Sequence, residues 1–334
     1  MRGVDVAAGR GAHVTGFVLR RAGALVLTVL LALAGLFALL ELAPGEASDN
    51  FGAVVVADPE ARAAIEASRG LDRPAPQRFW SFLTGAVRGD LGTSYYDGSD
   101  VAASIAAAAP VSLEIGFLAT VLVVLPGIAL GALAARRRGR PAELVVSVAS
   151  LLAVSVPSYW LAVVCLVVVG ERWPDLIPGA GSYVPFSEDP VANLKLLLLP
   201  SIVVGLGAFA LVARAVQASL GPALDEDDAT FARACGLPER TVVWRIAGRR
   251  AAPGVLAVAG LAVGGLLTGA VLVESVFQLP GLGQLLVTAF TRGDLPVALG
   301  GALVTAILLL GVNLLVDTAI VVLDPRHARR GAST

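Results

Sequence analysis

Ionisable side chains are scarce in this chain, and lysine and histidine are almost absent. Charged residues make up 15% of its 334 positions, against about 25% in ordinary soluble domains. There is one lysine, Lys195, and there are two histidines, His13 and His327. A phosphate-binding loop of the P-loop type needs a lysine directly after a glycine-rich stretch, and Lys195 follows no such stretch. The chain is therefore not expected to bind ATP in that way.

Other kinds of catalytic and metal site are excluded for the same reason. His13 and His327 stand near opposite ends of the chain, so they provide neither a Ser–His–Asp triad nor a metal-binding cluster. Cys165 falls within an apolar run and Cys235 within a polar segment, so a disulfide is not expected. We predict no catalytic residues, no metal and no cofactor. The net charge of −1 argues against a nucleic-acid partner.

Long apolar runs fill most of the remaining sequence, which is 56% hydrophobic. A helix needs about 20 apolar residues to cross the hydrocarbon of a bilayer. Six runs are of roughly that length or longer, and we predict an all-α membrane protein with six transmembrane helices. The first run could instead be a signal peptide, but it exceeds the usual apolar length of about 7–15 residues. The runs are 17–40, 111–135, 144–169, 196–216, 254–277 and 297–323.

The runs also predict how the chain is divided. Residues 1–42 form the cytoplasmic N-terminus and first helix, and residues 43–107 an extracytoplasmic loop region. Residues 108–323 hold five helices with a polar loop at about 217–252, and residues 324–334 form a cytoplasmic tail. Of the 25 lysines and arginines, 17 lie on the side that holds both termini. The positive-inside rule therefore predicts a multi-pass protein of the cell (inner) membrane with both termini in the cytoplasm.

The polar loop contains a charged segment between two apolar runs. A short helix is expected at about 228–235, with Phe231, Ala234 and Cys235 on one face. Gly236 suits a position of positive φ, and a second helix is expected at about 238–250. So short a first helix is not stable alone in water. The loop is either a connector packed on its own bundle or a docking element for another protein.

The sequence around this loop, "TFARACGLPERTV" at 230–242, resembles the cytoplasmic coupling loop (EAA loop) of ABC-importer permeases, in the variant of the dipeptide/oligopeptide/nickel transport family. Cys235, Ile246 and Arg250 depart from the residues usual there. Other stretches resemble the same family in the same order: "GLDRP" at 70–74, "RGDLGTS" at 88–94, "SVPSYWLA" at 155–162, "ESVFQLPGLGQLL" at 274–286, "NLLVD" at 313–317 and "LDP" at 323–325. Together they resemble the permease subunit whose first span is followed by a long external loop.

This resemblance implies a type I importer permease fold and a role as half of a translocation pathway. The solute would be a peptide or a related small molecule delivered by an extracytoplasmic binding protein. The implied partners are a second permease and two cytoplasmic ABC ATPase subunits, which hydrolyse the ATP, so the chain itself would not be an enzyme. The residues implied in ATPase docking are Asp228, Phe231, Ala232, Arg233, Ala234, Cys235, Gly236, Leu237, Glu239 and Arg240.

Four polar residues in or near the predicted spans are further candidates, because such residues are costly in a membrane. They are Glu114, Glu274, Asn313 and Asp317. They could line the solute pathway or a gate, or they could form hydrogen bonds between helices. An alternative function is ion-coupled secondary transport, which needs acidic or histidine relays near the midplane. A membrane protein without a transport role would not need the polar loop.

Overall fold

The computed structural model describes residues 3–42, 72–173 and 183–323. Within these ranges every regular element is a helix, apart from one isolated β-bridge between Thr93 and Asp100. The helices are α1 (Gly3–Leu42), α3 (Ala75–Val87), α4 (Val101–Ala119), η2 (Thr120–Val124), α5 (Leu125–Arg136), α6 (Pro141–Ser155), α7 (Ser158–Arg172), α8 (Pro190–Asp225), α9 (Asp227–Ala234), α10 (Glu239–Thr241), η4 (Val242–Ala247), α11 (Gly248–Phe277), α12 (Leu282–Arg292) and α13 (Leu295–Leu323).

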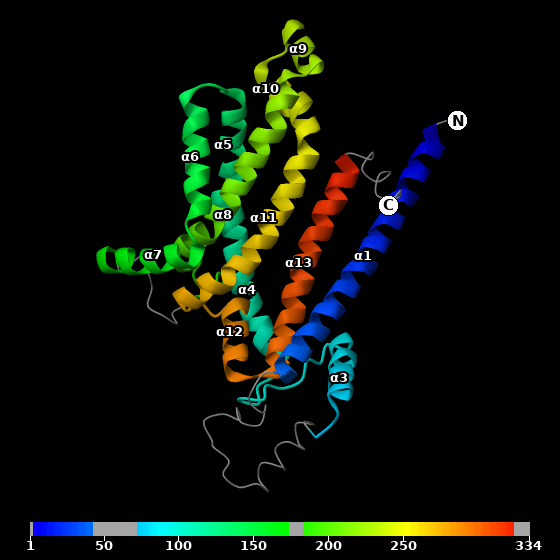
Figure 1. Cartoon of the computed structure of the whole chain (residues 1–334), viewed down its shortest axis with the longest axis vertical. Coiled ribbons are helices and arrows are strands. Elements are labelled where there is room, and N and C mark those ends of the chain that lie inside the picture. Colours follow the sequence, from blue (N-terminus) through cyan, green and yellow to red (C-terminus); the bar gives the residue numbers. More distant parts are fainter. Residues whose placement is uncertain (1–2, 43–71, 174–182, 324–334) are drawn as a thin grey trace.

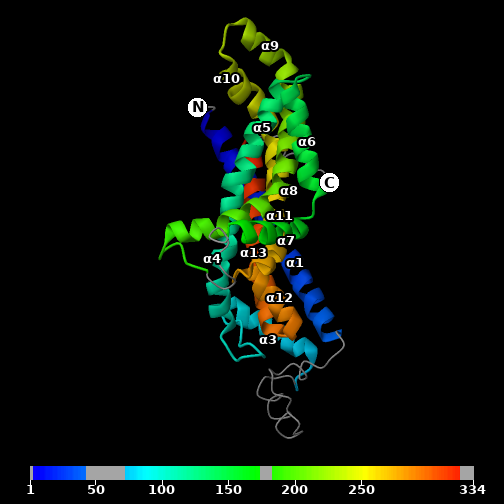
Figure 2. The same cartoon turned by 90° about the vertical axis from the view of Figure 1, so that its left-hand side faces the viewer.

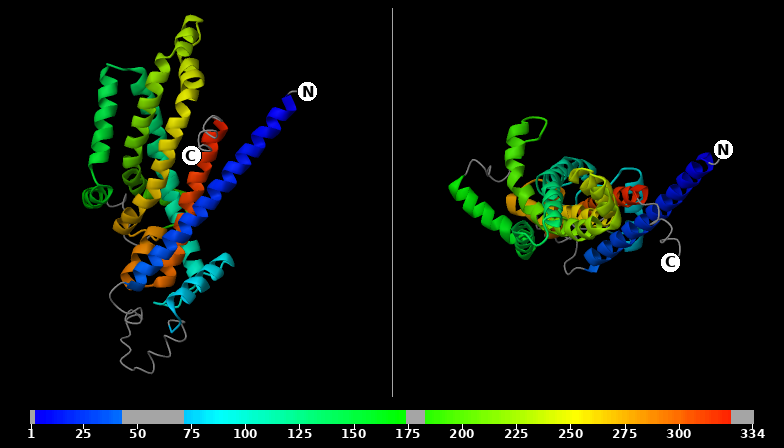
Figure 3. Two further views of the ribbon diagram at one scale, coloured as in Figure 1. Left: turned by 45° about the vertical axis from the view of Figure 1, so that its right-hand side comes forward. Right: turned by 90° about the horizontal axis from the view of Figure 1, so that it is seen from above.

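The long helices lie side by side and give the molecule two distinct ends (Figure 1). At one end α9 and α10 project beyond the bundle, and at the other end lie α3 and α12. Helix α8 is central, since it contacts α4, α5, α6, α7 and α11, whereas α1 packs along α13 at the side (Figure 3). The start of α1 and the end of α13 point toward the end that carries α9.

The membrane-spanning prediction is confirmed, with one correction. Five helical segments are long and apolar enough to cross a bilayer: Gly23–Leu42, Val101–Arg136, Pro190–Asp225, Glu239–Phe277 and Leu295–Ile320. The predicted continuous span at 144–169 is wrong. That segment is two helices, α6 and α7, bent by 92°, and α7 lies across the bundle and projects from it (Figure 2). The described residues therefore give five spans, or six if the bent pair is one.

Pro157 explains the bend. Its ring fixes its own φ, removes a backbone donor and disfavours helical geometry in the residue before it. Val156 accordingly has extended backbone angles, φ −96° and ψ 119°. Helix α6 ends at Ser155, and a new helix begins after the proline at Ser158. The sequence contained this signal within an apolar run that was long enough to suggest one helix.

Capping residues extend two helices beyond their apolar runs. The Asp100 side chain accepts a hydrogen bond from the N–H of Ala103 at 2.7 Å and begins α4 at Val101, inside the loop region predicted for 43–107. The Asp189 carboxylate accepts from the N–H groups of the second and third residues of α8 at 3.0 Å each. Such caps satisfy N–H groups that have no partner within the helix. Residues 43–71 of the predicted loop and the predicted tail, 324–334, lie outside the described residues.

The core of the bundle depends on close approach between helices. The backbone of Gly131 in α5 lies against that of Ala213 in α8, and a β-carbon at position 131 would be 2.5 Å from the Ala213 carbonyl oxygen. Small residues allow this contact, as is usual where helices pack within membranes. The packed α5, α8 and α11 thus form a frame that carries a helical corner at each end.

Candidate functional site

The coupling corner, which we define as residues 226–250, contains α9, α10, η4 and the first turn of α11. Helix α9 ends in a Schellman motif. The N–H of Leu237 bonds to the Ala232 carbonyl at 3.1 Å, and that of Gly236 bonds to the Arg233 carbonyl at 2.9 Å. Gly236 has a φ of +78°, which a glycine adopts without steric cost. The prediction of a glycine-cornered helix at this position is confirmed.

The coupling corner packs on its own chain through small and branched apolar side chains. Ala229 and Ala232 are the buried residues of α9, and Val242, Val243 and Ala247 are the buried residues of η4. All five belong to the same hydrophobic cluster as residues of α8 and α11. Ile246, on the same stretch of helix, is only partly buried. The opposite face of α9 is left open.

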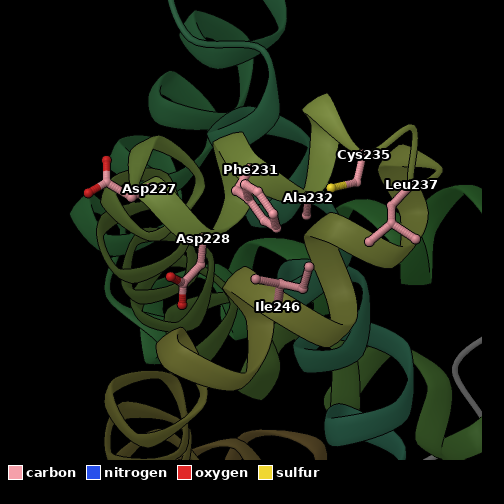
Figure 4. Close-up of a pocket in the computed structure, with 7 residues that line it drawn as sticks. All are labelled: Asp227, Asp228, Phe231, Ala232, Cys235, Leu237 and Ile246. Carbon is pink, nitrogen blue, oxygen red and sulfur yellow. The ribbon is translucent and has the colours of Figure 1, made fainter.

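That open face borders a hollow of about 610 Å³. Phe231 stands over it with 71% of its surface exposed, and its ring points toward Ile246 across the hollow (Figure 4). The lining is mostly apolar, with carboxylates at one side, and consists of Asp227, Asp228, Phe231, Ala232, Cys235, Leu237 and Ile246. Of the predicted docking residues, five line this hollow. An exposed aromatic ring beside an apolar hollow is a surface suited to a protein partner.

Ion pairs hold the flanks of the coupling corner. Arg233 pairs with Glu239 at 3.2 Å and donates to the carbonyl of Leu224 at 2.9 Å. Arg250 pairs with both Glu226 and Asp228. These side chains are between 39% and 58% exposed, so each pair contributes little to stability. Ala234, Cys235 and Arg240, also predicted for docking, are exposed.

The outer corner, named for the orientation that the positive-inside rule predicts and defined as residues 274–294, lies at the other end of the molecule and is built around Glu274. This side chain is 1% exposed. One carboxyl oxygen accepts a hydrogen bond from the hydroxyl of Ser112 in α4 at 2.7 Å. The other accepts from the N–H groups of Gly283 and Gln284 at 2.8 and 3.3 Å. Glu274 thus caps α12 across a turn, at the helix end where negative charge is favourable.

Two glycines make this cap sterically possible. A β-carbon at Gly281 would lie 2.3 Å from a Glu274 carboxyl oxygen, and one at Gly283 would lie 2.3 Å from the Cα of Val271. Gln278 ends α11 in the left-handed region, with a φ of +53°. The sequence "ESVFQLPGLG" therefore encodes a tight turn between two helices, closed by a buried carboxyl group. Ser112 was missed in the sequence because it is 162 positions away from Glu274.

A second buried carboxyl group fastens the far end of the outer corner. Asp294, which is 5% exposed, accepts hydrogen bonds from the Ser94 hydroxyl and from the N–H of Tyr95 at 3.1 Å. The guanidinium of Arg292 lies over the ring of Tyr96, 4.1 Å from its centre. Helix α12 is thus attached to α4 at its start and to the segment before α4 at its end. Nothing in the sequence marked this contact.

The other candidates for a pathway or gate lie apart from Glu274. Glu114 accepts hydrogen bonds from the Tyr183 hydroxyl and the Asn193 amide, both at 2.9 Å. Burial, together with Glu114, raises the pKa of Tyr183 to about 12. Asn313 and Asp317 are partly buried in α13. The described residues contain no group of three His, Cys, Asp or Glu side chains that could hold a metal ion.

Comparison with known proteins now identifies the family. Residues 127–329 match the family described as the binding-protein-dependent transport system inner membrane component. The chain belongs to this family. A protein named as a peptide transport system permease of Brucella suis biovar 1 is 33% identical over 318 residues, which cover 93% of this chain and 98% of that protein. The dipeptide transport system permease protein DppB of Escherichia coli K12 is 32% identical over 332 residues, with the same two shares covered.

Membership of this inner membrane component family confirms the predicted class of function. The chain is an all-α, multi-pass membrane protein and a permease subunit of an ABC importer. A permease of this family is a transport subunit and is not itself an enzyme. The alternative of ion-coupled secondary transport receives no support from these relatives.

Proposed function

We propose that the chain forms half of the translocation pathway for peptides or related small solutes. An extracytoplasmic binding protein delivers the solute, a second permease supplies the other half, and two cytoplasmic ABC ATPases supply the energy. The peptide permeases named above support the solute class, since they match over almost their whole length. Calorimetry on the binding protein that delivers solute to this permease tests that class. Binding of an unrelated solute, with no affinity for peptides, would contradict it.

The coupling corner is the proposed docking site for one ATPase. The observation that carries this proposal is the exposed Phe231 ring over an apolar hollow, on helices that project beyond the bundle. A hollow of this kind can hold an apolar side chain of the ATPase, while Asp227 and Asp228 at its edge set the orientation through charge. Movement of the ATPases would then reach the pathway through η4 and α11, which continue directly from the corner.

The Phe231→Asp variant tests this site. It places a charge over the apolar hollow, so we expect the permease to remain in the membrane at its normal level while ATPase capture and solute uptake fall at least tenfold. The matched control is Trp80→Asp, because Trp80 on α3 is equally exposed, at 67%, and lies at the other end of the molecule. Gly236→Pro should act like Phe231→Asp by distorting the corner. Normal uptake by both corner variants would remove the docking site.

The proposed orientation places the coupling corner and both termini in the cytoplasm. The chain offers a direct test, because Cys235 is exposed at the corner and the one other cysteine of the sequence is Cys165. In a Cys165→Ala background, a membrane-impermeant maleimide should label inside-out vesicles and leave intact cells unlabelled. Labelling of Cys235 from outside the cell would show that the coupling corner is extracytoplasmic and would contradict the proposed mechanism.

The four polar candidates are proposed to divide between structural roles and the solute pathway. The closed hydrogen-bond sets of Glu274 and Glu114 support a structural role for both, which joins α4 to α12 and α4 to α8. Asn313 and Asp317 remain candidates for the pathway or its gate. The division into 1–42, 43–107, 108–323 and 324–334 stays a proposal, with the start of α4 at Val101 as a better boundary for its second part.

A further inference from the structure

The turn between α5 and α6 concentrates positive charge at the same end of the molecule as the coupling corner (Figure 1). Four of its five residues, in the sequence "RRRGR" at 136–140, are arginines, and all of them are exposed. Within the described structure Arg138 is the one of the four that forms an ion pair. Its guanidinium lies against the backbone of Gly221 and pairs with Asp225 of α8 at 2.8 Å.

The acidic side chain nearest along the chain, that of Glu143, forms its hydrogen bonds with other partners. One carboxyl oxygen of Glu143 accepts a hydrogen bond from the N–H of Gly139 at 2.7 Å, and the other accepts from the Gln217 amide at 3.0 Å. Among the described residues, Arg136, Arg137 and Arg140 form no ion pair. Arg136 is near enough to Glu239 of the coupling corner for a Coulombic attraction, which is weaker than that of Arg233, and Arg137 and Arg140 have no acidic partner among the described ion pairs.

An apolar surface begins directly beyond these arginines. Helix α6 lies at the edge of the bundle (Figure 1) and buries only Val146 and Ser150. Its exposed side is aliphatic over its whole length, with Leu144, Val145, Val148, Leu151, Leu152 and Val154. A cluster of positive charge at the head of an exposed apolar helix matches the two parts of a phospholipid, an anionic headgroup and its acyl chains.

We propose that Arg136, Arg137 and Arg140 bind the phosphate of an anionic phospholipid whose acyl chains lie along α6. Guanidinium groups bind phosphate oxygens through paired, charge-assisted hydrogen bonds. The site itself follows from the geometry of the α5–α6 turn. Its assignment to the inner leaflet rests on the orientation given under the proposed function.

This site borders the coupling corner. Arg138, inside the same turn, is paired with Asp225, the last residue of α8 before α9 begins. A lipid that neutralises the neighbouring arginines would reduce their repulsion of Arg138 and so favour its pairing with Asp225. The bound lipid would thereby stabilise the Arg138–Asp225 ion pair, which joins the α5–α6 turn to the end of α8 beside the coupling corner.

Native mass spectrometry of the full-length, delipidated protein tests the proposal. Dioleoyl phosphatidylglycerol and dioleoyl phosphatidylcholine are titrated separately, and bound lipid is counted. We expect at least one phosphatidylglycerol to bind more tightly than phosphatidylcholine. The triple change R136Q/R137Q/R140Q should weaken that binding about tenfold to a hundredfold, because each arginine near an anionic lipid contributes roughly fivefold.

Two further variants separate the site from general charge and from misfolding. R73Q/R88Q/R172Q removes the same charge from exposed arginines elsewhere and should leave phosphatidylglycerol binding within about twofold of the native value. R136K/R137K/R140K keeps the charge but loses the paired guanidinium geometry, so its binding of phosphatidylglycerol should fall between that of the native chain and that of the triple glutamine variant. Soluble glycerol phosphate at the same concentration should not displace the lipid, because it has no acyl chains.

Several results would overturn the proposal. One is equal loss of lipid in the site and control variants, which would indicate general charge. Another is displacement by glycerol phosphate, which would indicate a free anion site. The third is unchanged phosphatidylglycerol binding by the triple glutamine variant together with lost ATPase capture, which would assign these arginines to a protein partner. All three readouts leave solute uptake aside, so failure here is distinguishable from failure of the proposed transport function.

Discussion

Each end of this permease contains a sharp corner between helices, and the two corners are stabilised by different interactions. At the outer corner two carboxyl groups, Glu274 and Asp294, are buried, and hydroxyl and backbone donors satisfy both. At the coupling corner the charges are exposed and paired with one another, and an apolar hollow is left open. Because the hydrogen-bonding groups of the outer corner are already paired within the chain, few remain to bind a partner. The coupling corner keeps its apolar groups available.

The largest loss of stability is expected when a side chain is added at a tightly packed glycine of the outer corner. Gly283→Ala adds a methyl group where a β-carbon would lie 2.3 Å from the Val271 backbone, and it should cost about 3 kcal/mol by overpacking. The matched control is Gly265→Ala in α11, where an added β-carbon would meet no neighbouring atom within 4 Å. Melting of detergent-solubilised protein, followed by size-exclusion chromatography, measures both. Equal melting temperatures would show that the outer corner is looser than described.

A smaller loss is expected from changing the buried carboxyl group itself. Glu274→Gln replaces one accepting oxygen by a donor that faces either the Ser112 hydroxyl or the Gly283 N–H. Leaving buried groups unpaired should lower stability by about 1–3 kcal/mol. Ser112→Ala should have a similar effect, and the double variant should lose less than the sum because the two residues share one network. Normal stability with altered uptake kinetics would instead return Glu274 to the solute pathway.

The smallest loss of stability is expected from breaking the exposed ion pairs of the coupling corner. Arg250→Gln removes the pairs with Glu226 and Asp228, whose side chains are exposed to solvent. Stability should fall by less than about 1 kcal/mol, and the difference should shrink as salt screens the charges. Thermal melting at low and high salt measures this. A loss as large as that of Glu274→Gln would erase the proposed contrast between the two ends.

The two corners also differ in how far the sequence predicted them. Local signals sufficed for the coupling corner, because the short helix at about 228–235, the glycine at 236 and the start of the second helix at about 238 are all marked by residues within one or two helical turns. The outer corner depends on Ser112 and Ser94, which lie far from their partners in sequence. The stretch "ESVFQLPGLG" therefore indicates a family resemblance but does not by itself predict these contacts. The bend at Pro157 was missed for a third reason, since the length of the apolar run was given more weight than the proline.

The hydroxyl of Ser112 has a mechanical consequence. It donates to Glu274 of α11 and accepts from the N–H of Leu282, the first residue of α12, at 2.8 Å. One atom of α4 is therefore bonded to two other helices at once, and none of the three can swing outward alone without breaking a bond in a water-poor setting. Any opening of the permease at this end must carry the tips of α4, α11 and α12 together as a single lever.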